Sequence, residues 1–318
     1  MQHTIEEQAE AAQLYRWIGA AGDAARIEHH PGFDDAARAF ATNLLEASER
    51  DPALDGIFKD AGRYVVALWA MYAHVSGGLT LPRLKEICAA SGLLSPGRAR
   101  ALLIYLRYLG FIELWPERAN GKPARYIPTG SFIAAWKSHL RVVLEAVRVI
   151  EPAMALVLAR LDNPGMFETF TRFQGEQLLY DAQTDEIMKS PYVRVFVSRH
   201  AGTQLIWLLG SSGTIAVFPP KGAIPFSAAA AAKRFRVSRI HIKRMLDEAE
   251  HEGLLTRKSD GAITFAESAR TTIRTFYGLQ LLALLDQAAR TLRETDAPDQ
   301  PVARHFQSGT AAALSSPA

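Results

Sequence analysis

The amino-acid sequence predicts a mostly α-helical protein with small β-hairpins, organised as two similar units that each contain helix, turn, helix and hairpin. Two observations lead to this prediction. First, two segments align without a gap at a separation of 143 residues, so that Leu81 falls on Ile224 and Gly110 falls on Gly253. Second, each segment starts with apolar residues at helical spacing and ends, after its glycine, in residues typical of a short strand pair.

Size and composition fit a globular chain of two domains. Of its 318 residues, 48% are hydrophobic and 22% are charged, and the net charge is +3. The single cysteine, Cys88, excludes an intramolecular disulfide and a cysteine-rich zinc site, and it fits a reducing, cytoplasmic setting. The longest uncharged run, Ala201 to Pro220, is interrupted by glycines, and the N-terminus has no secretory signal pattern, so we expect no membrane span.

In the second unit, the alanine-rich run from Ser227 to Phe235 is a strong helix former, and Pro225 suits the first turn of that helix. Ser238 is suited to cap the next helix, because its hydroxyl can accept a backbone N–H that has no helical partner. That helix has one apolar stripe, formed by Ile242, Met245, Leu246 and Ala249. Gly253 is suited to end it. Two strands are expected next, Leu254 to Lys258 and Ala262 to Phe265.

The first unit repeats this order. A helix is predicted over Leu81 to Ser91, Ser95 caps the following helix, and Gly110 ends it. The strands of the hairpin are expected at Phe111 to Trp115 and at Arg125 to Ile127. Helix, turn, helix and hairpin in this order make a winged helix-turn-helix domain, so the predicted fold is two such domains in tandem plus accessory helices.

Apolar helices flank both units. They are predicted at Arg63 to Val75, Phe132 to Val149, Val193 to Leu209 and Ala269 to Leu292. The last of them suits either a dimer or interdomain contact or the core of its own domain, and both remain open. The predicted division is an N-terminal helical region (1–52), a first winged-helix domain (53–150), bridging helices (151–190), a second winged-helix domain (191–294) and a disordered tail (295–318).

Positive charge is concentrated in the second unit. From Ile187 to Leu246 there are ten lysines and arginines and no aspartate or glutamate. The acids of the predicted second helix all lie in its C-terminal half, from Asp247 to Glu252. Because a helix that enters the major groove by its N-terminal end presents its first turns to the bases, this segregation favours DNA binding.

Both units supply candidate DNA contacts. Those of the second unit are Ser238, Arg239, His241, Lys243, Arg244, Lys233, Arg234, Arg236, Arg257 and Lys258. Arg239 is suited to pair with guanine, Ser238 and Lys243 to hold phosphates, and the wing residues Arg257 and Lys258 to reach an adjacent phosphate or the minor groove. Those of the first unit are Ser95, Arg98, Arg100, Arg118, Lys122 and Arg125.

The second helix of the first unit is unusually apolar. It carries Ile104, Tyr105, Tyr108 and Leu109. An apolar surface of this kind is seldom left open to solvent, so we expect part of the helix to pack against another domain or subunit. The first unit is therefore the weaker candidate for reading DNA.

The run from Val237 to Leu246, followed by Glu252 to Leu255, resembles the recognition helix and the start of the wing in bacterial winged-helix regulators of the GntR and MarR types. Those regulators carry a similar Ser-Arg-x-x-Val-x-Arg-x-Leu helix that ends in Glu-Gly-Leu. The resemblance is weaker over the first unit. It implies a transcription regulator that binds double-stranded DNA, associated with the nucleoid when bound. The tandem arrangement departs from these regulators, so their effectors are not implied.

Other functions remain open. Tandem winged helices also occur in plasmid replication initiators, which bind repeated origin sequences, and in scaffolds that bridge proteins without binding DNA. Enzyme activity is not expected, because His29-His30 lacks metal-ligand spacing and Gly210 to Gly213 is neither a nucleophile elbow nor a phosphate loop. We therefore expect no catalytic residue, metal or cofactor. A homodimer is one option, since operators are often palindromic.

Overall fold

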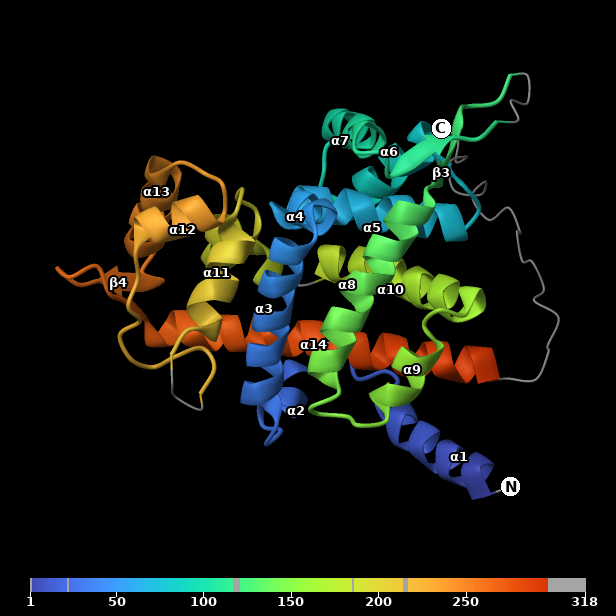
Figure 1. Cartoon of the computed structure of the whole chain (residues 1–318), viewed down its shortest axis with the longest axis horizontal. Helices are drawn as coiled ribbons and strands as arrows, with labels where there is room; N and C mark the ends of the chain where they lie inside the picture. Colours follow the sequence, from blue (N-terminus) through green and yellow to red (C-terminus); the bar gives the residue numbers. More distant parts are fainter. Residues whose placement is uncertain (1, 22, 117–120, 185, 214–216, 297–318) are drawn as a thin grey trace, which may run out of the picture.

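A computed structural model of the chain describes residues 2–21, 23–116, 121–184, 186–213 and 217–296. Helices dominate it, and two small antiparallel sheets complete the fold, so the prediction of a mostly α-helical protein with small β-hairpins is confirmed. Figure 1 shows the helices packed across one another, with one sheet in each of two separate regions. None of the helices in the described ranges has the length and hydrophobicity that a membrane span requires.

Four helices precede the first unit. They are α1 (Gln2–Tyr15), α2 (Ala24–Glu28), α3 (Phe33–Arg50) and α4 (Pro52–Phe58). Their apolar sides are buried, as expected for amphipathic helices at a core. Among them, α3 packs against helices of both units, and Figure 1 shows it running between them.

The elements of the first unit include the helices and the hairpin that the sequence predicts and one short strand, at Leu79–Thr80, that it does not. They are α5 (Ala61–Val75), β1 (Leu79–Thr80), α6 (Leu81–Ser91), α7 (Pro96–Tyr108), β2 (Ile112–Leu114), β3 (Arg125–Pro128) and α8 (Gly130–Val147). Strand β3 lies between β1 and β2, with Leu79 opposite Tyr126 and Ile112 opposite Pro128. Helix α6 begins where expected, because Thr80 caps it and proline occupies its first turn.

Two helices and two single turns link the units. They are α9 (Met154–Arg160), α10 (Pro164–Thr184), the 3-10 turn η1 (Glu186–Lys189) and the π turn η2 (Val193–Val197).

The second unit follows the same order. Its elements are α11 (Gly202–Ser211), α12 (Ala228–Arg234), α13 (Arg239–His251), β4 (Leu255–Arg257), β5 (Ile263–Phe265) and α14 (Glu267–Asp296). Strands β4 and β5 pair antiparallel, and Ile224 forms a bridge with Ile263 that extends this sheet as β1 extends the other.

Matched positions of the repeat have matched local geometry. Ser95 caps α7 and Ser238 caps α13, and each serine oxygen accepts the N–H of the residue three positions later. Gly110 and Gly253 have φ of 71° and 67°, a left-handed conformation that glycine adopts without strain. The gap-free alignment of the two segments therefore corresponds to like elements in space.

Three predicted boundaries are wrong. The expected helix from Val193 to Leu209 is broken, because the chain turns back so tightly that a Cβ at Gly202 would overlap the Phe196 carbonyl. Pro225 precedes α12 instead of lying in its first turn, since Ser227 is the cap. Helix α14 continues through Asp296, so the predicted tail begins inside it, and positions 297–318 lie outside the described residues.

Helix α14 is largely buried within the chain. It packs against α1, α2, α3, α8, α9 and α10, and Figure 1 shows it crossing the molecule below most of the other helices. Leu281, Leu282, Leu285 and Leu292 are fully buried on it. Its apolar side therefore serves the chain's own core.

One histidine lies in that core. His139 of α8 is 4% exposed, and its Nε2 atom is 3.3 Å from the Tyr64 hydroxyl, with which it forms a hydrogen bond. Burial lowers the pKa of His139 from 6.5 to about 3, because a charged imidazolium is poorly solvated there. The folded protein therefore keeps this side chain neutral at pH values where the unfolded chain protonates it.

We expect His139 to make the fold acid-sensitive. Since its pKa is depressed on folding, stability is lost as pH falls below 6.5, and the loss continues until pH approaches about 3. Between pH 7 and pH 5 this one group should cost about 2 kcal/mol of unfolding free energy. Urea denaturation at pH 7 and at pH 5 measures this loss. Between these pH values, the unfolding free energy of His139→Gln should fall by about 2 kcal/mol less than that of the wild type. The exposed His29, changed to Gln, serves as the control, and an equal loss in all three proteins would contradict the assignment.

Candidate nucleic-acid interface

Helix α13 presents a basic face at its N-terminal half. The Ser238 oxygen accepts the His241 N–H at 3.1 Å and so fixes where the helix begins. The stripe of Ile242, Met245, Leu246 and Ala249 is buried, as predicted. Arg239, Lys243 and Arg244 are exposed on the opposite side, and none of them forms an ion pair with any residue that the structure describes.

The acids in the C-terminal half of α13, and Glu252 directly after it, are all paired with arginines. Asp247 and Glu250 contact Arg257 at 2.7 and 2.6 Å, Glu252 contacts Arg194 at 2.6 Å, and Glu248 forms an ion pair with Arg199. Hydrogen bonds from the side chain and backbone of Arg257 hold the pKa of Glu250 below its ordinary value. The negative charge of α13 is thus neutralised within the protein, whereas the positive charge of its first turns is not.

Arg257 holds the β4–β5 hairpin to α13. Its guanidinium lies between Asp247 and Glu250, and its backbone N–H also donates to Glu250 at 3.0 Å. The side chain predicted to reach DNA is therefore committed to two carboxylates. Lys258, the next residue, is exposed, and its backbone N–H bonds Ala262 across the hairpin at 2.8 Å.

A hollow of about 550 Å³ is lined by the start of α12, the exposed side of α13 and the hairpin turn. Arg239 and Lys243 line one side of it, and Ser227 lines another. Asp260 of the hairpin turn also borders it and accepts the Ala262 N–H at 2.9 Å. The hollow joins the basic turns of α13 to the hairpin in one concave surface.

Of the other predicted contacts in the second unit, two bind partners within the protein and two are exposed. The His241 ring donates from Nε2 to the His200 carbonyl at 2.7 Å, which ties the start of α13 to the segment before α11. Arg234 forms an ion pair with Glu49 of α3. Lys233 is exposed at the end of α12, as is Arg236 in the turn that follows. Arg236 has φ of 54°, which is uncommon for a residue with a Cβ.

Sequence reasoning missed Ile240. This residue lies in the first turn of α13 and is 63% exposed, between two basic positions of the outer face. Helical spacing already separates it from the buried stripe that begins at Ile242. An apolar residue at such a place suits contact with the methyl group of thymine in the major groove.

In the part of the first unit that the structure describes, the predicted contacts do not form an equivalent cluster. Arg98 forms an ion pair with Asp60 at 3.4 Å and lies against Gly62, and Arg125 stacks over Trp115 with 5.4 Å to the ring centre. Arg100 and Lys122 are exposed. Arg118 lies outside the described residues.

Helix α7 is packed on one side and exposed on the other. Tyr105 lies under Arg63 of α5, whose Nη1 donates to the tyrosine hydroxyl at 3.3 Å, and Leu109 is half-buried near Gly56. Tyr108, in contrast, is 85% exposed, and Ile104 is also exposed. Both contacts lie within the predicted first domain (53–150), so the expected packing of this helix against another domain or subunit is not seen among the described residues.

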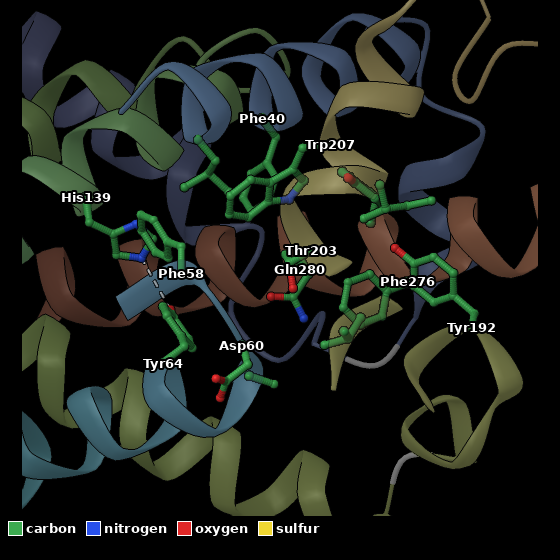
Figure 2. Close-up of a pocket in the computed structure, with 15 residues that line it drawn as sticks. Phe40, Phe58, Asp60, Tyr64, His139, Tyr192, Thr203, Trp207, Phe276 and Gln280 are labelled. Carbon is green, nitrogen blue, oxygen red and sulfur yellow. Dashed lines mark hydrogen bonds between the residues drawn. The ribbon is translucent and has the colours of Figure 1, made fainter. Parts of the chain in front are cut away.

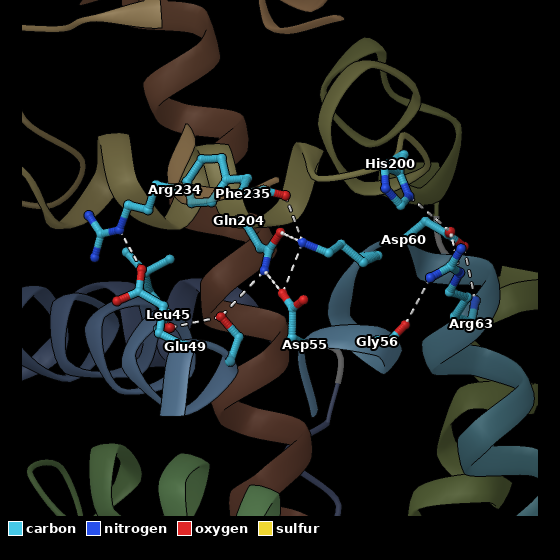
Figure 3. Close-up of polar contacts among 12 residues, drawn as sticks. Leu45, Glu49, Asp55, Gly56, Asp60, Arg63, His200, Gln204, Arg234 and Phe235 are labelled. Atoms are coloured by element: carbon cyan, nitrogen blue, oxygen red, sulfur yellow. Dashed lines mark hydrogen bonds and ion pairs between the residues drawn. The ribbon is translucent and has the colours of Figure 1, made fainter. Parts of the chain in front are cut away.

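A polar junction joins the two units, and Figure 3 shows its contacts. Lys59 is 7% exposed, forms an ion pair with Asp55 at 2.9 Å and donates to the Phe235 carbonyl at the end of α12 at 2.8 Å. Buried Gln204 of α11 accepts from Lys59 at 3.4 Å and donates to Asp55 at 2.9 Å. These bonds fix α12 against α4 and α11.

Asp60 continues this junction toward α7. It caps α5 and contacts Arg63 at 3.3 Å, Arg98 at 3.4 Å and His200 at 3.9 Å. Burial alone would raise the pKa of Asp60, but the contact with His200 and the neighbouring arginines hold it below its ordinary value. Asp60 is therefore ionised. It contacts the start of α7 directly through Arg98, and it is connected to the start of α13 through His200 and His241.

Metal binding and thiol chemistry can be assessed for the described residues. Within them, no group of three or more His, Cys, Asp and Glu side chains is placed to hold a metal ion. Cys88 is fully buried, and burial raises its thiol pKa to about 11, which disfavours a thiolate. Comparisons with protein families, with curated proteins and with solved structures found no match to this chain. Function is therefore inferred from the residues and their geometry.

Proposed function

We propose that this chain is a sequence-specific DNA-binding protein that regulates transcription, built from two tandem winged helix-turn-helix units. The observation that carries the proposal is the charge arrangement on α13. Its exposed N-terminal turns carry arginine and lysine side chains without ion pairs to any described residue, whereas its three acids and Glu252 directly after it are paired with arginines. Uncompensated positive charge at a helix start suits the phosphates and base edges of a major groove.

Each exposed side chain then has a role. Arg239 pairs with a guanine, and Ile240 contacts a thymine methyl. Lys243 and Arg244 hold phosphates on the two sides of the groove, and the N-terminal end of α13 adds a favourable dipole. Lys258 of the hairpin reaches the next phosphate, since it is exposed beside Arg257, which borders the hollow next to α13.

The paired residues act as positioning residues. His241 anchors the start of α13 on His200, and Arg257 anchors the hairpin on Glu250. Side chains held in this way keep the helix and the hairpin at a fixed spacing, so less conformational freedom is lost when DNA binds. The first unit, whose Arg98 and Arg125 are occupied, is assigned a supporting role.

A salt series tests the proposal. Fluorescence anisotropy of a labelled duplex should show binding that weakens linearly in a plot of log affinity against log salt. The double variant Lys243→Ala, Arg244→Ala should lower the slope by about two units, since each lost phosphate contact removes about one. Absence of binding to any duplex at low salt would refute the proposal.

Replacing Lys258 by alanine should lower the salt slope by about one unit and weaken binding to all sequences alike, because a phosphate contact carries no base information. The matched control is Lys122→Ala, an exposed lysine in the corresponding loop of the first unit, and it should keep the wild-type slope. An unchanged slope in the Lys258 variant would remove the hairpin of the second unit from the interface.

A further inference from the structure

A cavity of about 130 Å³ lies where α3 and α4 meet helices of both units, α5 and α8 of the first and α11 and α14 of the second. Its walls are mostly aromatic, and they are formed by Phe40, Phe58, Tyr64, Tyr192, Trp207, Phe276 and Tyr277. Figure 2 shows the labelled rings among these arranged around Thr203 and Gln280, with Asp60 to one side. The volume approaches the roughly 150 Å³ of an apolar cavity that was engineered in another protein and binds benzene. A single aromatic ring therefore fits.

Polar atoms in the wall have no partner. The hydroxyls of Tyr192 and Tyr277 and the Nδ1 atom of His139 are buried and form no hydrogen bond with any described residue. All three side chains are more than nine-tenths buried and line the same cavity. Figure 2 shows the Tyr192 hydroxyl directed toward the middle of the group. Because buried polar groups in proteins are nearly always hydrogen-bonded, these atoms indicate a missing partner.

The charge of the wall restricts what that partner is. Among the described residues that line the cavity there is no lysine or arginine, and Asp60 is the one ionised group. Burial keeps His139 neutral by lowering its pKa to about 3. An anion would thus find no opposite charge, whereas a neutral molecule loses little on leaving water.

We propose that this cavity binds a neutral single-ring aromatic molecule with one hydrogen-bonding substituent, such as a phenol. The ring packs among Phe58, Trp207 and Phe276, and its polar group bonds the unpartnered tyrosine hydroxyls. This binding does not depend on the proposed DNA-binding function.

The cavity also adjoins the contacts between the two units. Its wall residue Asp60 contacts Arg98 at the start of α7 and His200, whose carbonyl accepts from His241 at the start of α13. A ligand that moves Asp60 or Thr203 would alter how both helices are held. We extend the proposal to regulation, which rests on the proposed function: the ligand changes the affinity for DNA, and DNA changes the affinity for the ligand by the same factor.

Fluorine NMR of 4-fluorophenol with the full chain tests the binding site. Line broadening should saturate, phenol should displace the probe at least about five-fold better than toluene, and benzoate should not displace it. Tyr192→Phe and Tyr277→Phe should each lower the affinity for phenol toward the affinity for toluene. The affinity for toluene should not change. Tyr108→Phe, which alters an exposed hydroxyl, is the matched control and should bind as wild type.

Any of three results would overturn the site. The first is that a cooperatively folded wild-type chain shows no saturable binding, and the second is that phenol and toluene bind with equal affinity. The third is that both cavity tyrosine variants keep full affinity for phenol. Thr203→Phe, which fills the cavity from its rim, should abolish binding while thermal unfolding remains cooperative, and retained binding would place the ligand elsewhere.

Anisotropy with labelled DNA tests the regulatory part separately. At saturating phenol, the Kd for DNA should change by about five-fold or more in wild type and not in Thr203→Phe. Saturable phenol binding with an unchanged Kd for DNA would overturn the regulation alone. Phenol binding by a chain that binds no duplex would overturn the proposed function and leave the ligand site in place.

Discussion

Replacing Arg239 by alanine is expected to weaken binding to the preferred DNA site by about 1–3 kcal/mol and to relax the preference at one base pair. Arg239 is the first residue of α13, is exposed and borders the hollow beside the hairpin. A guanidinium so placed can bond two acceptors of guanine at once, and no other base presents the same pair. Anisotropy with the preferred duplex and with single-base variants of it measures both effects.

The control for this prediction is Arg293→Ala, which removes an exposed arginine near the end of α14, on a different part of the molecule. It should leave affinity and preference unchanged. If Arg239→Ala weakened binding to every sequence by the same factor, the side chain would be a phosphate contact and another residue would have to read the base.

Replacing Lys59 by alanine should lower the free energy of unfolding by about 3–5 kcal/mol, as for other buried ion pairs that lose one partner. The change leaves Asp55 without its cation and the Phe235 carbonyl without its Lys59 hydrogen bond. Lys59→Met keeps the apolar stem and isolates the loss of the charge. Urea denaturation followed by circular dichroism gives both values.

Lys122→Ala is the surface control for Lys59 and should change stability by less than about 0.5 kcal/mol. Because the junction holds α12 against α11, Lys59→Met should also loosen α12, which hydrogen exchange of the α12 amides detects. Stability equal to that of the wild type in both Lys59 variants would show that the junction does not hold the units together.

The helices and hairpins were predictable because their signals are local. Ser95 and Ser238 cap helices, and Gly110 and Gly253 end them, through bonds that span only a few residues. The break before α11 was not predictable, because it depends on the close approach of Gly202 to the Phe196 backbone. Apolar periodicity carries no information about such an approach.

The exposed basic residues of α13 were predictable, whereas the internal partners of neighbouring residues were not. The charge segregation along α13 identified Arg239 and Lys243 correctly as exposed basic residues. His241 and Arg234 find partners 41 and 185 positions away, at His200 and Glu49, and no spacing rule relates such residues. The exposure of Ile240 was within reach, since its position on the helix opposes the buried stripe.

The cavity was beyond sequence reasoning for the same physical cause. Its wall combines residues such as Phe40, His139, Trp207 and Tyr277 from four helices that are distant in sequence. Each of these residues taken alone is an ordinary core residue on an apolar helix face. Only their packing leaves a space and hydroxyls without partners.

The central claim is that the first turns of α13 read DNA sequence. Selection of bound duplexes from a random pool, carried out with the wild-type chain and with Arg239→Ala, tests it most directly, since it reports affinity, motif and half-site spacing together. The account predicts that the wild type enriches one motif and that the variant enriches the same motif with the preference for guanine lost at one position. A pool that stays random with the wild-type chain, or an identical motif from both proteins, would contradict the claim.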